Sequence, residues 1–136
     1  MRRLRQKPSV FAALARDLAV NGDGFERDAE RFLADRGLVT LARNVRYRCG
    51  ELDLVMLEET TLVFIEVRFR AHEGFGGALA SLDARKQARL RAAAATYLQA
   101  HPEHAHRPIR FDLLAGGGDR HRPRWDWIRN AIEDAP

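Results

Sequence analysis

Two apolar stretches decide the fold: ELDLVML at residues 51–57 and TLVFIEVRF at residues 61–69. Both are rich in β-branched and aromatic residues, and both contain apolar–polar alternation with a period of two. Only residues 58–60 separate them, which leaves room for a tight turn and nothing longer. We therefore expect the two stretches to form an antiparallel hairpin.

The hairpin register brings acidic side chains together. If the turn centres on residues 59–60, Asp53 lies opposite Glu66 and Glu51 lies opposite Arg68. A slip of one residue would break both pairings and reverse the burial pattern. The second pairing is explained by a cross-strand ion pair, but the first places like charges opposite each other, which destabilises a sheet.

Alternation also assigns the side chains to faces. On the first strand the two acids share one face, opposite Leu52 and Leu54. On the second strand the acid and the base share a face with Phe64, opposite Val63, Ile65 and Val67.

The facing carboxylates have more than one explanation. One of them could face solvent on an edge strand, or the two could share a proton or hold a hard divalent cation. An acid followed on the next strand by acid-x-base, here Asp53 and then Glu66-Val67-Arg68, is typical of metal-dependent nucleases of the restriction-endonuclease type. In those enzymes Mg²⁺ polarises the phosphate and lowers the pKa of a bound water, which attacks in line.

Further elements are predicted on both sides of the hairpin. Apolar residues at helical spacing predict helices over residues 9–20, 24–36 and 82–100, with Gly37 capping the second. Additional strands are predicted at residues 38–47 and 109–114, and a β-leaning stretch at 124–129. Residues 70–80 form a glycine-rich loop, residues 101–108 a surface loop, and glycines 116–118 end the strand that precedes them.

This order predicts an α/β fold with a central mixed sheet and helices packed on it: helix, three-strand antiparallel meander, helix, strand. The expected organisation is an N-terminal extension with a short helix over residues 1–21, one domain over residues 22–132 and a tail over residues 133–136.

Composition narrows the class of protein. The 136 residues fit one domain, and a single cysteine, Cys49, excludes an intramolecular disulfide and suits a reducing cytoplasm. The net charge is +4, and all basic residues except Lys7 and Lys86 are arginines. No stretch approaches the about 20 apolar residues of a membrane span. We expect a cytoplasmic protein with no membrane partner.

A set of short motifs resembles a known family. Along the chain these are Glu26-x-x-Ala29-x-x-Phe32-Leu33, Asn44-x-Arg46, Gly50-Glu51-Leu52-Asp53-Leu54, Phe64-Ile65-Glu66-Val67-Arg68, Lys86-Gln87, Arg110-Phe111-Asp112 and Asn130-Ala131. Together, over roughly residues 22–132, they resemble the YraN-like family of bacterial proteins. That family is similar to the restriction-endonuclease-like PD-(D/E)xK superfamily, as a remote relative of archaeal Holliday-junction resolvases.

The resemblance implies site residues and a metal. Asp53 and Glu66 match the metal-binding acids, Glu26 matches a third acid of the resolvases, and Glu51 is a family-specific companion. The implied cofactor is Mg²⁺ or Mn²⁺, with no small-molecule cofactor. Arg68 stands where the superfamily usually has a lysine; arginine stabilises negative charge but cannot accept a proton as a perturbed lysine can.

The expected catalytic set is completed by Lys86, at the start of the long helix, where a helix N-terminus favours phosphate. A solvated position is the alternative for this lysine. DNA is the expected partner, through arginines that either contact the nucleic-acid backbone or form an ordinary solvated face: Arg46, Arg70, Arg85 and Arg89.

Three functions therefore remain open. The first is a metal-dependent endonuclease that hydrolyses DNA phosphodiesters, with branched DNA as one candidate substrate. The second is a nucleic-acid-binding module that keeps the fold without turnover. The third is a structural or partner-binding protein whose acids are neutralised by arginines. A homodimer is an open option for all three.

The remaining reactive residues predict less. His101, His104 and His106 lie in a proline-containing loop without a partnering cysteine, so a zinc site is not expected. Cys49 has no histidine at a fixed spacing, which argues against a nucleophile. Trp125 and Trp127 share one strand face, which favours packing in a core or a dimer over base stacking.

Overall fold

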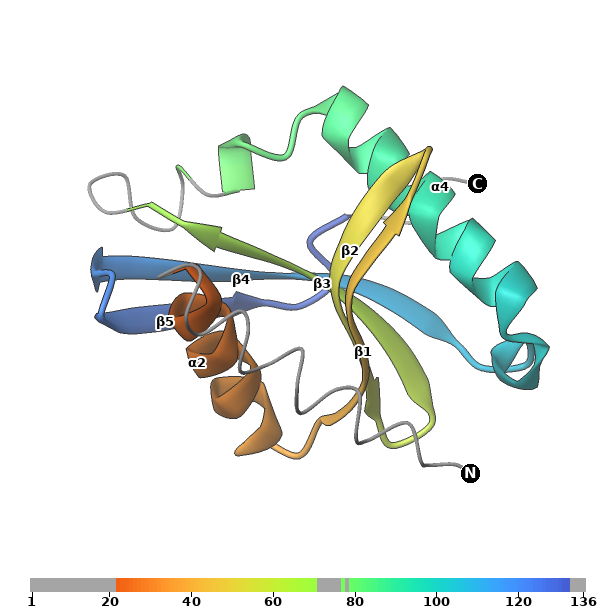
Figure 1. Cartoon of the computed structure of the whole chain (residues 1–136), viewed down its shortest axis with the longest axis horizontal. Helices are drawn as coiled ribbons and strands as arrows, with labels where there is room; N and C mark the ends of the chain where they lie inside the picture. Colours follow the sequence, from red (N-terminus) through yellow and green to blue (C-terminus); the bar gives the residue numbers. More distant parts are fainter. Residues whose placement is uncertain (1–21, 71–76, 78, 133–136) are drawn as a thin grey trace.

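The computed structural model describes residues 22–70, 77 and 79–132 (Figure 1). The elements, in chain order, are α2 (Gly22–Ala34), β1 (Val39–Tyr47), β2 (Gly50–Glu58), β3 (Thr61–Phe69), α4 (Ala84–Ala100), the 3-10 helix η1 (Pro102–His104), β4 (Ile109–Asp119) and β5 (Arg122–Ile128). The predicted helix over residues 9–20, the tail and most of the glycine-rich loop lie outside the described residues. In the part of the chain described here, no helix is long and apolar enough to cross a membrane.

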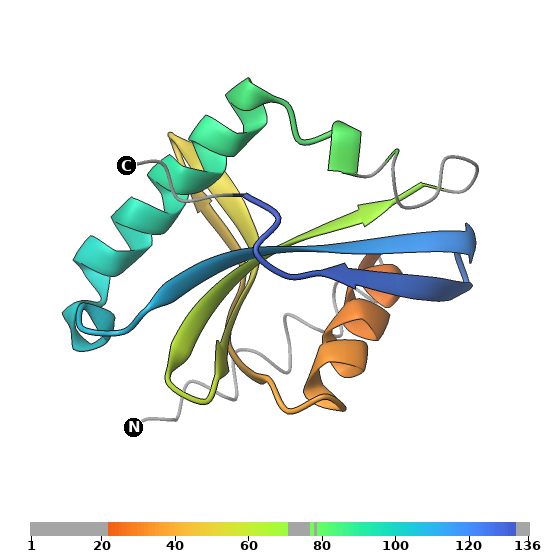
Figure 2. The same ribbon diagram turned by 180° about the vertical axis from the view of Figure 1, so that it is seen from behind.

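The five strands form one mixed sheet in the order β1-β2-β3-β4-β5. Three neighbouring pairs are antiparallel, and β3 and β4 are parallel because α4 crosses over between them. Figure 2 shows β4 running between β3 and β5 across the molecule. The prediction of an α/β fold with a central mixed sheet and an antiparallel meander is confirmed.

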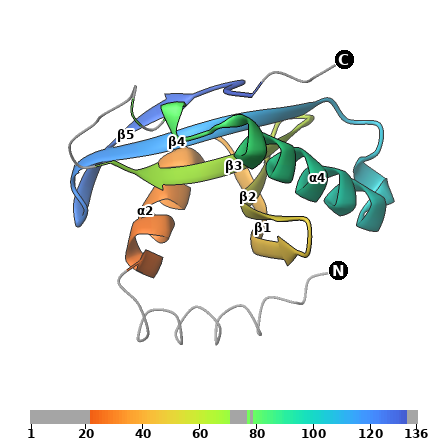
Figure 3. The same cartoon turned by 90° about the horizontal axis from the view of Figure 1, so that it is seen from above.

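The two helices cover the two faces of this sheet. Phe64 belongs to the core beneath α4, with Leu90 and Tyr97, whereas its neighbour Val63 belongs to the core beneath α2, with Leu33. Successive residues of a strand point to opposite faces, so these cores lie on opposite sides. Figures 1 and 3 show that the helices also lie toward opposite ends of the sheet.

Local sequence explains where the elements end. Gly37 has a φ of 99° after α2, a left-handed conformation that glycine adopts at low cost and that stops the helix as predicted. The carboxylate of Asp83 accepts the N–H of Lys86 and caps the start of α4. The β2–β3 turn has Glu58 opposite Thr61, as the hairpin prediction requires.

One predicted strand end is wrong. The glycines at 116–118 were expected to end the strand, but β4 continues through them to Asp119 and pairs with β5. A Cβ on Gly116 would lie 2.8 Å from the ring of Trp125 and 3.0 Å from that of Phe25. Gly116 therefore makes room for aromatic rings inside the sheet. Trp125 and Trp127 pack on the α2 core, one of the two predicted alternatives for them.

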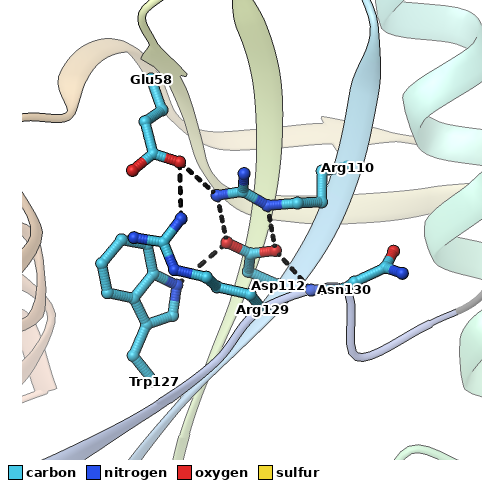
Figure 4. A network of polar contacts seen from close by, with 6 residues as sticks. All are labelled: Glu58, Arg110, Asp112, Trp127, Arg129 and Asn130. Atoms are coloured by element: carbon cyan, nitrogen blue, oxygen red, sulfur yellow. Dashed lines mark hydrogen bonds and ion pairs between the residues drawn. The ribbon is translucent and has the colours of Figure 1, made fainter.

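A buried polar network ties the C-terminal strands to the hairpin turn (Figure 4). Its centre is Asp112, whose side chain is 0% exposed. The two carboxylate oxygens accept hydrogen bonds from both arms of Arg110 (2.8 Å each), from the indole N–H of Trp127 (2.9 Å) and from the backbone N–H of Asn130 (2.9 Å). Glu58 at the turn accepts from Arg110 and Arg129.

We predict that Asp112→Ala lowers the free energy of unfolding by about 3 kcal/mol, because it removes four hydrogen bonds and leaves the partly buried Arg110 guanidinium with Glu58 alone as its acidic partner. Urea unfolding followed by circular dichroism measures the change. Asp119→Ala, at the exposed end of the same strand, is the matched control and should cost less than about 1 kcal/mol. Equal losses in the two variants would contradict a central role for the network.

Candidate functional site

The sheet forks between β2 and β3. Their pairing begins at the turn and ends at Leu54 opposite Ile65, whereas β3 continues beside β4 as far as Phe69 opposite Gly116. In Figure 1 β2 runs up toward α4 and β3 runs to the left with β4. The predicted register therefore holds near the turn, but the strands separate just before Asp53 and Glu66 would face each other.

Asp53 lies in this fork. Hydrogen-bonding groups alternate in direction along a strand, so after Ile65 the next N–H of β3 that points to β2 is that of Val67. The Asp53 Oδ2 atom accepts this N–H at 2.9 Å, in place of a backbone carbonyl of β2. The carboxylate thus satisfies a donor that the fork would leave unpaired.

The predicted faces of β2 are wrong on one side of the fork. Leu54 packs in the α2 core, but Leu52 packs in the α4 core on the other face. In a regular strand, residues two positions apart point to the same face. Asn44 has a left-handed backbone (φ 51°) and lies between Arg43, which pairs with Leu54, and Val45, which pairs with Leu52. This irregularity rotates the β1–β2 ribbon at the level of Asp53. An asparagine within an alternating strand was the available signal, because asparagine tolerates this conformation better than most residues.

The Asp53 and Glu66 carboxyl groups meet and share a hydrogen bond. Burial raises the pKa of Glu66 to about 7, and the neighbouring Asp53 charge adds to the effect, while Arg68 and Lys86 oppose it. Burial also raises the pKa of Asp53, against the Val67 N–H, the hydrogen bond from Glu66 and the charge of Arg68. The pair therefore holds a proton near neutral pH more readily than isolated acids do.

Arg68 contacts the acid on its own strand. Its Nε atom lies 2.8 Å from Glu66 Oε2, and the side chain is 18% exposed. The expected cross-strand pair between Glu51 and Arg68 is not among the ion pairs of the described residues, because the strands have already separated at that level. The Arg68 Nη2 atom is buried and has no hydrogen-bond partner within residues 22–70, 77 and 79–132.

A hollow of about 180 Å³ opens beside the carboxyl pair on the α4 side. Its lining consists of Asp53, Glu66, Glu51, Lys86, Arg89 and Leu90. The structure thus brings Lys86 and Arg89 from the first turns of α4 to the acids of the hairpin. The N–H of Lys86 is already bonded to Asp83, so this amide does not point at the hollow as a free donor.

Other predicted site residues lie elsewhere. Glu26 lines a separate, smaller space of about 20 Å³ on the α2 side, with Asp53 and Val67 in its wall. Arg46 pairs with Glu51 across β1 and β2 and is exposed, as is Arg85 on α4. Arg70 follows the last residue of β3 and donates its backbone N–H to Gly116. Asp53 therefore lines both spaces, whereas Glu26 lines only the space on the α2 side and Glu51 and Glu66 line only the hollow on the α4 side.

The histidines and the cysteine have structural contacts. His101 stacks on Tyr97 with ring centroids 4.0 Å apart, and His104 accepts from Arg107 at 3.0 Å. Cys49 lies 3.5 Å from the Thr96 hydroxyl. Across the described residues, no three histidine, cysteine, aspartate or glutamate side chains gather closely enough to hold a metal by themselves.

We predict that the free energy of unfolding falls as pH rises from about 4.5 to 7 in metal-free buffer. Glu66 binds its proton more tightly when folded (pKa about 7) than when unfolded (4.5), so the penalty is absent below 4.5 and complete above 7. It amounts to about 3 kcal/mol. Glu66→Gln should remove most of it and be more stable than the parent at pH 8 but not at pH 4.5, as measured by urea unfolding.

The matched control is Glu30→Gln. Burial raises the pKa of Glu30, but hydrogen bonds from Arg43 and Thr40 outweigh it, so the net pKa is lowered and the ionised form stabilises the fold. This variant should lose stability at pH 8. A Glu66→Gln variant that is also less stable at pH 8 would refute the assigned electrostatics.

Comparison with known proteins places these residues in a family. A family model described as "Uncharacterised protein family UPF0102" matches residues 25–115. A UPF0102 protein of Pseudomonas putida (strain GB-1) is 50% identical over 113 residues, covering 82% of this chain and 92% of the relative. A UPF0102 protein of Alcanivorax borkumensis is 46% identical over 120 residues, covering 88% and 96%. The chain belongs to the UPF0102 family, the YraN-like family that its motifs resemble.

Proposed function

We propose that this protein is a Mg²⁺-dependent endonuclease that hydrolyses phosphodiester bonds of DNA at Asp53 and Glu66. One observation carries the proposal: two partly buried carboxyl groups are held in contact in the sheet fork, with Arg68 on one side and a hollow lined by Lys86 on the other. Such an arrangement costs stability in the free protein, and a divalent cation would remove that cost.

The donor set fits Mg²⁺ better than larger or softer metals. Two carboxylates provide hard oxygen ligands, and the described residues supply no third acid, histidine or cysteine at the same point. Mg²⁺ is commonly bound by one or two carboxylates, with water and substrate phosphate as its other ligands. Asp53 and Glu66 would hold the metal, and Glu51 in the wall of the hollow would add negative charge around it.

The residues of the chain have distinct tasks in this reaction. When bound, the metal polarises the phosphate and supplies an activated water. Arg68, whose Nη2 atom is buried without a partner among the described residues, stabilises charge on the phosphate oxygens. Lys86 adds a second positive charge from the wall of the hollow. Glu66 must lose the proton that it shares with Asp53, so the carboxyl pair is competent only after deprotonation.

A non-catalytic nucleic-acid-binding module is the second candidate. Arg68 favours it, because an arginine at this position cannot transfer a proton. The close Arg68–Glu66 ion pair favours the third candidate, a structural or partner-binding protein whose acids are neutralised internally. Two measurements separate the three candidates.

The first measurement is metal binding. We predict that Mn²⁺ binds and broadens the NMR signals of Val67 and Leu54 selectively, with one proton or fewer released per metal at pH 7. Asp53→Asn should abolish the broadening, because it removes a ligand charge but leaves an oxygen for the Val67 N–H. Glu30→Gln, outside the carboxyl pair, is the control and should leave binding unchanged. No binding at millimolar Mn²⁺ would favour the third candidate.

The second measurement is cleavage of branched, nicked and single-stranded DNA. If Arg68 acts by its charge, Arg68→Lys should retain activity and Arg68→Ala should lose about a hundredfold or more. If a lysine is needed for proton transfer, the parent should be nearly inert and Arg68→Lys should gain activity. Lys86→Ala tests whether Lys86 already serves as the lysine in this proton transfer. If the protein binds DNA but neither the parent nor any variant cleaves it with any metal, the second candidate is identified.

A further inference from the structure

A second hollow lies on the α4 side of the sheet, beyond the candidate metal site. Its volume is about 440 Å³, and Ala115 and Gly117 of β4 and Arg124 and Asp126 of β5 contribute to its lining. The main sheet contact of α4 is with β2, and in Figure 1 the far ends of β4 and β5 extend to the left beyond α4. On this part of the face Arg124 and Asp126 are exposed.

The two hollows are connected by a row of paired residues. Arg68 pairs with Ala115, and Ala115 pairs with Asp126, so their side chains share one face of the sheet. Glu66, two residues before Arg68, faces the same way and lines the first hollow. Arg68 therefore lies between the carboxyl pair and the second hollow.

A side chain at Gly117 would fit among the described residues around it. A Cβ there would lie 3.7 Å from the Arg70 carbonyl oxygen, an ordinary contact, and its backbone is not left-handed. Gly116, by contrast, makes room for aromatic rings, and Gly118 has a φ of 79°. The missing side chain at Gly117 leaves bare strand backbone in the lining of the second hollow.

The lining has the chemistry of a nucleotide site. Arg124 is exposed and provides a charged fork for a phosphate. Asp126 repels phosphate but accepts hydrogen bonds from a base amino group, such as that of cytosine. Arg124 lies two strands away from Glu66 and four residues further along the sheet. The straight-line distance between the two positions is therefore roughly 16 Å. An unpaired strand extends to roughly twice the 3.4 Å rise per nucleotide of a duplex strand, so this length corresponds to about two or three nucleotide steps.

We infer that the second hollow binds an unpaired nucleotide of the same DNA strand that reacts at Asp53 and Glu66, about two or three nucleotides away. Arg124 holds its phosphate, Asp126 accepts from its base, and Gly117 leaves room for both. The inference rests on the proposed function and makes it more specific: the substrate carries a single-stranded segment next to the reacting phosphate.

The test compares fluorescently labelled oligo(dC) of two and ten nucleotides in low salt with EDTA, which prevents cleavage. In the parent protein the longer strand should bind on the order of tenfold or more tightly. Gly117→Leu, which fills the hollow, and Arg124→Glu, which reverses its charge, should each remove most of this gain. Circular dichroism checks that both variants remain folded, and Arg124 is exposed, so its replacement should not affect folding.

Two controls match these variants. Arg31→Glu makes the same change of charge on α2, where Arg31 is 72% exposed, and Ala34→Leu adds the same bulk at the exposed end of that helix. Both should keep the length-dependent gain. A gain that survives in Gly117→Leu and Arg124→Glu, or falls equally in Arg31→Glu, would overturn the second hollow while leaving the proposed function intact. A parent protein that binds neither oligonucleotide nor branched DNA would overturn both.

Discussion

The hydrogen bond from the Val67 amide to the Asp53 carboxylate is the contact on which the arrangement of the site depends. A β-strand cannot leave its neighbour inside a protein without orphaning backbone donors, and each orphan costs about 1–3 kcal/mol. Here a side chain takes the place of the missing carbonyl, so β3 can separate from β2 and continue beside β4. The gap that this creates is where the second acid, the arginine and the hollow beneath α4 come together.

The acid cluster around Asp112 and the pair formed by Asp53 and Glu66 differ in how their negative charge is balanced. Asp112 has four donors in place and its charge is fully matched, so this cluster stabilises the packing of β4 and β5. For two carboxyl groups, Asp53 and Glu66 have one N–H donor, that of Val67, and one neighbouring positive charge, that of Arg68. A shared proton compensates for the second negative charge. The second cluster therefore keeps acceptor capacity that the first has already used.

Local patterning was enough to predict most of the sheet and the closeness of Asp53 to Glu66. Period-2 alternation and a short turn fix the β2–β3 register as far as Leu54 opposite Ile65, one residue before the two acids. The continuation of β4 through its glycines could not be predicted, because it depends on aromatic rings from α2 and β5 that are distant in sequence. The fork was missed for a related reason: a register assumes that strands stay paired, whereas Asn44 and Asp53 end the pairing through backbone conformation and a side-chain contact. Glu26, grouped with the other acids by resemblance, lines the space on the α2 side together with Asp53 and does not line the hollow on the α4 side.

The Val67 amide is also a natural probe of the site. Most amides of a central strand are bonded to a neutral carbonyl, and their hydrogen exchange reports unfolding of the sheet. This amide is bonded to a carboxylate that shares a proton with its neighbour, so its exchange rate and chemical shift follow the charge of the acid pair. A single backbone resonance therefore records the protonation of the acid pair and the separation of the two strands at the same point.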